Sequence, residues 1–156
     1  SALADAVALA RAEAVTRGVP VDICPLVSAD AAVPQCANTN TWEAGFMVCP
    51  REEAAGIGRC TDAASTVGIS NLPVQVFEAQ PTSVSVRASG FTGETVVTFE
   101  SDGSLFAAGN FTICSDGSTT SAQALMVNVA GLSRVAVDSD GDGLVNVSAT
   151  GQISCP

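Results

Sequence analysis

The chain has 156 residues, which is enough for one domain with a substantial hydrophobic core. Six basic residues, all of them arginine, stand against sixteen acidic residues, so the formal net charge at pH 7 is −10 and non-specific binding to nucleic acid is disfavoured. Histidine is absent, which leaves serine and cysteine without the usual base that activates them as nucleophiles. No apolar run approaches the roughly 18 residues of a membrane span.

The first seventeen residues predict the only clear helix in the sequence. Its apolar positions recur at steps of three and four, as Leu3, Val7, Ala10 and Ala14. Gly18 and Pro20 then predict a sharp end, because glycine tolerates the left-handed conformation after a helix and proline cannot continue one. The stripe is mostly alanine, so we expect this helix to approach a β-sheet closely and to act as a spine.

The remainder of the chain predicts short antiparallel strands arranged as a meander. β-branched and alternating residues mark the following strands: 19–23, 41–49, 74–77, 84–88, 96–99, 111–114, 124–129, 135–137 and 144–147. Gly45 within the second of them suggests a bulge or a close backbone contact, and Trp42, the only tryptophan, is expected in the core. The predicted fold class is therefore α+β, with the helix Ser1 to Arg17 packed on antiparallel sheets in a single domain, 1–156.

The six cysteines predict disulfide bonds. No pair has the CxxC spacing of a zinc site or a redox motif, and no histidine is available to complete a metal site. The order along the chain favours sequential pairing, as Cys24 with Cys36, Cys49 with Cys60, and Cys114 with Cys155. On the chain-entropy model the two short loops contribute about 3 kcal/mol each and the long loop about 4 kcal/mol. Such a framework places the protein in an oxidising compartment.

Two groups of acidic residues could carry chemistry. Asp138, Asp140 and Asp142 occupy positions one, three and five of a calcium-loop pattern with Gly143 at position six, but position twelve is Ala149 instead of glutamate. An acidic hairpin turn is the simpler interpretation, so calcium remains an open alternative. The carboxylates at 52–53 and at Glu100 and Asp102 are interpreted as solvated loop charges. No catalytic residue and no cofactor is predicted.

Three segments resemble the GspH/FimT family of type IV pilin-like proteins. Residues 10–25, ARAEAVTRGVPVDICP, resemble the family's AR-x-EA-x-x-RG-x-PV-x-x-C signature. Residues 42–48, WEAGFMV, resemble its W-x-x-G-W/F-x-V strand, and residues 111–114, FTIC, with Cys155, resemble its closing cysteine pair. The resemblance implies a non-enzymatic minor pilin that helps prime assembly of the type IV pilus, lies near its tip, and supports piliation, twitching motility and adhesion.

The resemblance also implies a location and partners. The family's N-terminal helix begins as a transmembrane and polymerisation segment behind a cleaved leader, so we expect an upstream apolar segment that the present sequence lacks. The protein would then reside in the inner membrane with a periplasmic domain before assembly, and in the pilus afterwards. The expected partners are other minor pilins and the major pilin.

Two alternative functions remain open at this stage. A DNA-binding pilin of the FimT branch would carry basic residues after a glycine in its C-terminal region, whereas residues 131–135, GLSRV, contain one arginine, so no nucleic-acid partner is expected. A secreted, calcium-stabilised adhesion module would use the aspartates at 138, 140 and 142. A gel shift at low salt tests the first alternative, and thermal melts with calcium test the second.

Overall fold

The expected N-terminal helix is present as α1, Ala2–Arg17, in a computed structural model that describes residues 1–32, 34–51, 73–147 and 153–156. The Ser1 hydroxyl caps it by accepting the N–H of Ala4 at 3.2 Å. At the other end Gly18 adopts φ 66°, and its N–H donates to the carbonyl of Ala14 at 2.9 Å. The buried face contains every predicted stripe residue and Ala6 as well: Leu3, Ala6, Val7, Ala10 and Ala14.

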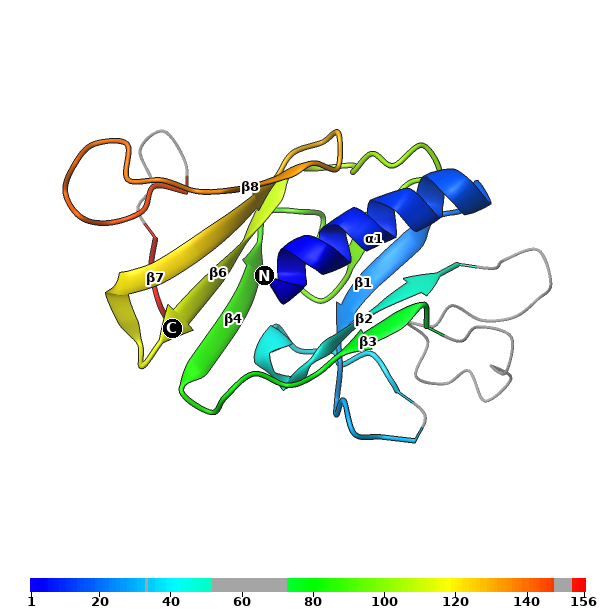
Figure 1. Ribbon diagram of the computed structural model, residues 1–156, viewed down its shortest axis with the longest axis horizontal. Helices are drawn as coiled ribbons and strands as arrows, with labels where there is room; N and C mark the ends of the chain where they lie inside the picture. Colours follow the sequence, from blue (N-terminus) through cyan, green and yellow to red (C-terminus); the bar gives the residue numbers. More distant parts are fainter. Residues whose placement is uncertain (33, 52–72, 148–152) are drawn as a thin grey trace.

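Two four-stranded antiparallel sheets make up the rest of the described fold (Figure 1). In the first sheet the order is β3, β2, β1, β5, with bounds Gln75–Phe77, Phe46–Pro50, Val21–Pro25 and Val97–Phe99. In the second sheet the order is β4, β6, β7, β8, with bounds Val84–Ser89, Gly109–Ser115, Ser118–Val127 and Ser133–Val135. Helix α1 lies across the first sheet, and its N-terminal end lies between the two sheets in this view. The α+β prediction is confirmed.

The predicted meander is correct for β1 to β3 and for β6 to β8, which pair in chain order, but it is wrong between β3 and β6, where consecutive strands change sheets. After β3 the chain crosses to the second sheet as β4, and β5 then returns to pair with β1. The expected strand at 144–147 is also not formed among the described residues. There the chain makes a backbone hydrogen bond from Asn146 N–H to the carbonyl of Val137, at 3.1 Å. Alternation of side chains predicts which face of a strand is buried but not which neighbour it pairs with, which explains these errors.

Trp42 is fully buried, as expected, but it lies outside the strand predicted at 41–49. Residues Trp42–Ala44 form a 3-10 turn, η1, and β2 begins only at Phe46. Gly45 separates the two with φ 109°, and a Cβ there would lie 2.8 Å from the carbonyl oxygen of Phe77. The predicted close backbone contact at Gly45 is therefore confirmed.

One main hydrophobic cluster joins the helix and both sheets. Its members come from α1, η1, the seven strands β1 to β7 and two loops, and include Val7, Ile23, Trp42, Phe99 and Phe111. A smaller cluster covers the opposite face of the second sheet, where Ile153 near the C-terminus packs on Ala122, Ala124 and Ala136. The second sheet is therefore covered on both faces.

We expect Ala10→Leu to destabilise the protein by about 1–3 kcal/mol. Ala10 lies fully buried on the inner face of α1, and three added carbon atoms would overpack the helix against the sheet. The matched control is Ala12→Leu, at an exposed position of the same helix, which should change stability by no more than about 0.5 kcal/mol. Urea unfolding of the two variants measures the difference. Equal midpoints would show that α1 does not pack closely.

Candidate functional site

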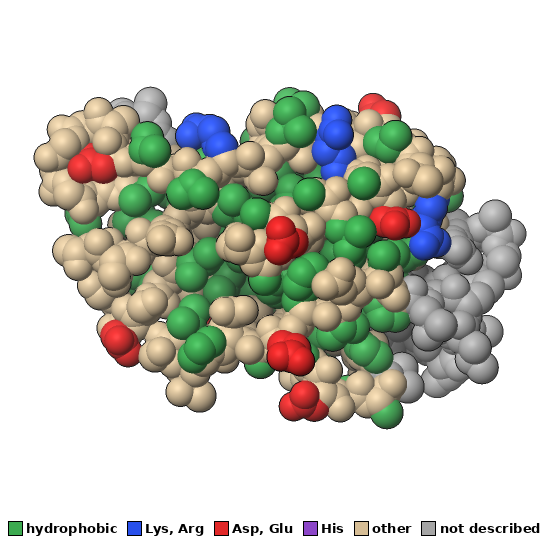
Figure 2. Space-filling model, viewed as in Figure 1, with side chains coloured by type: hydrophobic (Ala, Val, Ile, Leu, Met, Phe, Trp, Pro, Cys, Tyr) green, Lys and Arg blue, Asp and Glu red, His purple; other side chains and the backbone are tan. Residues whose placement is uncertain are grey.

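The outer face of α1 is the first candidate for a functional surface. A hydrogen bond from the Arg11 Nε–H to the carbonyl of Ala130, at 3.0 Å, ties the helix to the turn between β7 and β8. In that turn Gly131 has φ 81°, and a Cβ there would overlap the carbonyl oxygen of Gly103. The same Cβ would lie 3.1 Å from the Cδ atom of Arg11, so helix and turn fit together closely. The side of α1 that faces solvent carries Ala8, Ala12 and Val15. On this face of the molecule apolar side chains spread across the middle, and charged groups are scattered (Figure 2).

A buried ion pair lies in the first sheet. The carboxylate of Asp22, 1% exposed, accepts hydrogen bonds from Arg51 Nε at 2.7 Å and from the Thr98 hydroxyl at 2.7 Å. Arg51 also donates to Thr98 through Nη2 at 3.1 Å. Because these residues come from β1, β5 and the end of β2, the cluster holds three segments in register. Both oxygens of the Asp22 carboxylate are hydrogen-bonded, which is typical of a structural ion pair and not of a catalytic acid.

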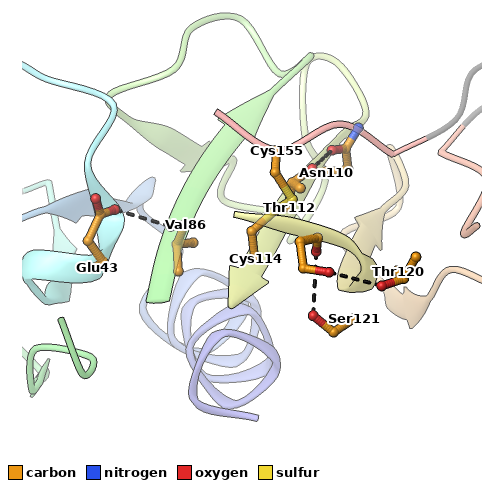
Figure 3. The surroundings of a disulfide bond; sticks show 9 residues. Glu43, Val86, Asn110, Thr112, Cys114, Thr120, Ser121 and Cys155 are labelled. Carbon is orange, nitrogen blue, oxygen red and sulfur yellow. Dashed lines mark hydrogen bonds between the residues drawn. A yellow bond between two sulfur atoms is a disulfide. The ribbon is translucent and has the colours of Figure 1, made fainter. Parts of the chain in front are cut away.

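Side chains from the β1–β2 connection close the outer edge of β4. Asn40 accepts the N–H of Ala88 at 2.8 Å and donates to its carbonyl at 2.9 Å. Glu43 accepts the N–H of Val86 at 3.1 Å (Figure 3) and pairs with Arg87 at 2.6 Å. Burial alone would raise the pKa of Glu43, but the hydrogen bonds from Arg87 and Val86 and the charge of Arg87 together lower this pKa below its usual value. Glu43 is thus an ionised structural group.

Disulfide bonds fasten the connection after β1 and the C-terminal end of the chain to the sheets. Cys24 in β1 is bonded to Cys36, with Cα atoms 5.6 Å apart, and Cys114 in β6 is bonded to Cys155, with Cα atoms 6.0 Å apart (Figure 3). Cys49 is also disulfide-bonded. Cys60 lies outside the described residues, so the pairing of Cys49 with Cys60 stays a prediction.

The carboxylate pairs that were considered as catalytic acids form no active site in the part of the chain that the structure describes. Asp102 accepts hydrogen bonds from the hydroxyl and the N–H of Ser104, at 2.5 and 2.9 Å, and these bonds lower its pKa. A general acid needs the opposite shift. Glu100 lies in the same tight turn, where its N–H donates to the carbonyl of Ser104 at 2.8 Å. The pair at 52–53 lies outside the described residues.

The three aspartates of the calcium-like loop do converge. One carboxylate oxygen from each of Asp138, Asp140 and Asp142 lies within 4.8 Å of the others, and all three residues are exposed. The same carboxylates bond to their own loop: Asp138 accepts the N–H groups of Gly141 and Gly143, each at 2.8 Å. Ala149, which stands at the twelfth position of the pattern, lies outside the described residues. The arrangement is a self-capped acidic turn whose oxygens could also meet a hard cation such as calcium.

Two interactions at these sites were not predicted from the sequence. The bond from Arg11 to Ala130 joins residues far apart in the chain, and no local pattern points to it. The ion pair of Asp22 with Arg51 could have been anticipated in part, because an acidic residue in the middle of an apolar strand needs a buried partner for its charge.

Comparisons with known proteins identify relatives of this chain. A family model described as type II transport protein GspH matches residues 1–141. Two crystal structures of the type IV minor pilin FimU from Pseudomonas aeruginosa PAO1 share the fold. The P21 form has a TM-score of 0.60 at 18% identity, covering 85% of this chain and 81% of FimU, and the P65 form has 0.59 at 18%, covering 85% and 86%. No curated protein sequence is significantly similar.

Within the described residues, no helix is both long and apolar enough to cross a membrane.

We expect removal of the Cys114–Cys155 bond to cost more stability than removal of the Cys24–Cys36 bond. The sequence separations are 41 and 12 residues, so the chain-entropy model gives about 4 and about 3 kcal/mol. The paired variants Cys114→Ser/Cys155→Ser and Cys24→Ser/Cys36→Ser can be compared by thermal and urea unfolding. The reverse order of stability would contradict the expectation.

The acidic loop should lose stability only at low pH. Hydrogen bonds from the N–H of Gly143 and then of Gly141 lower the pKa of Asp138, so the stabilisation is complete above the ordinary aspartate pKa and disappears as the pH falls through the lowered value. The amide signals of Gly141 and Gly143 should follow this titration by NMR, and Asp138→Asn should abolish it. A transition at or above the ordinary aspartate pKa would contradict the assignment.

Proposed function

The chain belongs to the GspH family, and from this premise we propose that it is a structural minor pilin that helps prime assembly of the type IV pilus. It would be incorporated near the tip of the fibre and support piliation, twitching motility and adhesion. Its fold is pilin-like, and pilins are structural proteins, so the role requires surfaces that bind neighbouring subunits and not a reaction centre.

The observation that carries this proposal is the position of α1. The helix is held over the main hydrophobic cluster by a face rich in alanine, while Ala8, Ala12 and Val15 stay exposed on its other side. Small exposed side chains allow a helix of a neighbouring subunit to approach closely. A helix that is packed on one side and open on the other suits a subunit that is added to a fibre along this element.

The charge of the chain constrains its partners. With a net charge of −10 it should favour neighbours that present lysine or arginine, among them other minor pilins and the major pilin. Residues 131–135, which include β8, carry Arg134 as their one basic residue, which gives little attraction for a nucleic acid. By analogy with the family, an apolar upstream segment would hold the protein in the inner membrane, with this domain in the periplasm, before assembly.

A second candidate is a subunit of a type II transport fibre. The description of the matching family favours it directly. Both candidates use the same pilin-like fold, which this chain shares with FimU. The discriminating phenotype is secretion of exported enzymes in the second case and loss of surface pili in the first.

We expect deletion of the gene to reduce surface pili and twitching sharply, with both restored by the full-length gene. Ala12→Arg should fail to restore them, because it places a bulky charge on the open side of α1. The matched control is Ser121→Arg, at an exposed position of β7, which should restore piliation. Electron microscopy and a twitching assay measure the outcome, and immunoblots verify that each variant accumulates.

Residues 1–156 exported alone to the periplasm should not restore pili, because the proposed membrane segment would be missing. Full piliation by this form, or by Ala12→Arg, would contradict the assembly role. If instead piliation is unaffected by deletion while secretion is lost, the type II transport candidate replaces the first.

A further inference from the structure

The outer edge of β8 is the most accessible strand edge of the second sheet. At the other end of that sheet, the edge of β4 is closed by Asn40 and Glu43. Strand β8, Ser133–Val135, pairs with β7 on one side, and all three of its residues are exposed. Figure 1 shows it as the last strand of the sheet, opposite β4. Unpaired backbone groups along such an edge can pair with a strand from another chain.

The register shows which backbone groups face outwards. The carbonyl of Leu132 accepts the N–H of Asn128 at 3.0 Å, and the N–H of Ala136 donates to the carbonyl of Ala124 at 2.8 Å. Residues 132, 134 and 136 therefore direct their backbone groups towards β7, because inward and outward bonding alternates along an antiparallel strand. The N–H and carbonyl groups of Ser133 and Val135 consequently point away from the sheet.

The chain itself uses this edge once. The outward carbonyl of Val137, which continues the alternation of Ser133 and Val135, accepts the N–H of Asn146 at 3.1 Å. The edge is thus suitably placed to receive a backbone donor. No such partner contacts Ser133 or Val135 within the part of the chain that the structure describes.

Arg134 adds a charge to the edge. Of the arginines that the structure describes, the other four bond through their side chains to Ala130, Glu13, Asp22 and Glu43, whereas the Arg134 side chain has neither a hydrogen bond nor an ion pair. Its side chain lines a groove of about 590 Å³ on the outer face of the sheet, together with Asn110, Met126, Leu132 and Val147. In a chain with a net charge of −10, an unpaired arginine beside a groove favours an acidic partner group.

Apolar side chains complete the surface. Val135 is 63% exposed and Val137 62% exposed, and both project to the side of the sheet opposite Arg134 because successive side chains alternate. Leu132 is 54% exposed and lies on the same side as Arg134. A strand added here would bury apolar groups on both of its faces.

We propose that the edge of β8 binds an extended segment of a partner protein, which adds a fifth strand to the second sheet and places an aspartate or glutamate opposite Arg134. Backbone bonds to Ser133 and Val135 provide affinity, and side chains on alternate positions provide specificity. The segment carries β-branched residues on either side of its acid, to pack on Val135. Towards the acidic loop, Asp138 to Asp142, it carries lysine or arginine. This inference rests on the strand edge and does not depend on the pilin role.

The test uses residues 1–156 and the soluble peptide Lys-Val-Thr-Val-Asp-Val-Thr-Val-Thr as the probe, because antiparallel pairing with the aspartate opposite Arg134 places this lysine beside Asp138. In an NMR titration the amide signals of Ser133 and Val135 should shift and their hydrogen exchange should slow. A peptide with lysine in place of the aspartate should bind roughly three- to tenfold more weakly, the size expected for reversing one exposed cross-strand charge pair. Arg134→Glu should invert this preference.

Two proline variants test the register. Val135→Pro should keep the melting temperature and abolish peptide binding, because the lost N–H faces outwards. Ala136→Pro should lower the melting temperature, because its N–H bonds to Ala124. Absence of shifts at β8, equal binding of both peptides, unfolding of Val135→Pro, or a self-association that occupies β8 in place of the peptide would each overturn the proposal.

Discussion

Burial of Trp42 between the two sheets is the interaction on which the rest of the structure depends. The indole is fully buried, lies edge-on to Phe111 of the second sheet at 4.9 Å between ring centroids, and is 6.3 Å from Phe46 of the first sheet. Its N–H donates to the carbonyl of Glu94 at 3.0 Å, so burial leaves no polar group unpaired. Phe77 stacks on Phe46 at 4.9 Å, and the aromatic series thereby joins β3 to β6. The same cluster contains the buried face of α1, so the helix and both sheets share one core.

The position of the helix and the open edge of β8 both follow from that shared core. Helix α1 covers the same cluster, and its alanine stripe allows the close approach that the hydrogen bond from Arg11 to Ala130 requires. The turn η1, which presents Trp42, also presents Glu43 to the edge of β4. One end of the second sheet is therefore closed by the segment that joins the sheets, whereas the far end, at β8, has no equivalent cover among the described residues. Surfaces for assembly are then expected on the open side of α1 and at β8.

Much of this fold could be predicted from local patterns, and the rest depended on distant contacts. The periodicity of Leu3, Val7, Ala10 and Ala14 and the stop at Gly18 predicted the helix and its buried face, because both are properties of one segment. The assignment of β5 to the first sheet was missed, because pairing partners depend on packing across the chain. The sequence around Trp42 predicts a strand, because its aromatic and β-branched residues favour extended structure locally, whereas the structure has a turn there. The convergence of Asp138, Asp140 and Asp142 was predictable from their spacing. That the Arg134 side chain is unpaired could not be predicted, because it depends on which distant residues the other arginines bind.

Hydrogen exchange of the Trp42 indole N–H tests most directly whether one core unites the helix and both sheets. The chain has a single tryptophan, so one indole signal reports on the junction. If the core is shared, this proton exchanges only when the whole domain unfolds, with the same free energy of opening as the slowest backbone amides of β1 and β6. An indole proton that exchanges through a much smaller opening free energy, while β1 and β6 stay protected, would show that the two sheets are stable separately and would contradict the account.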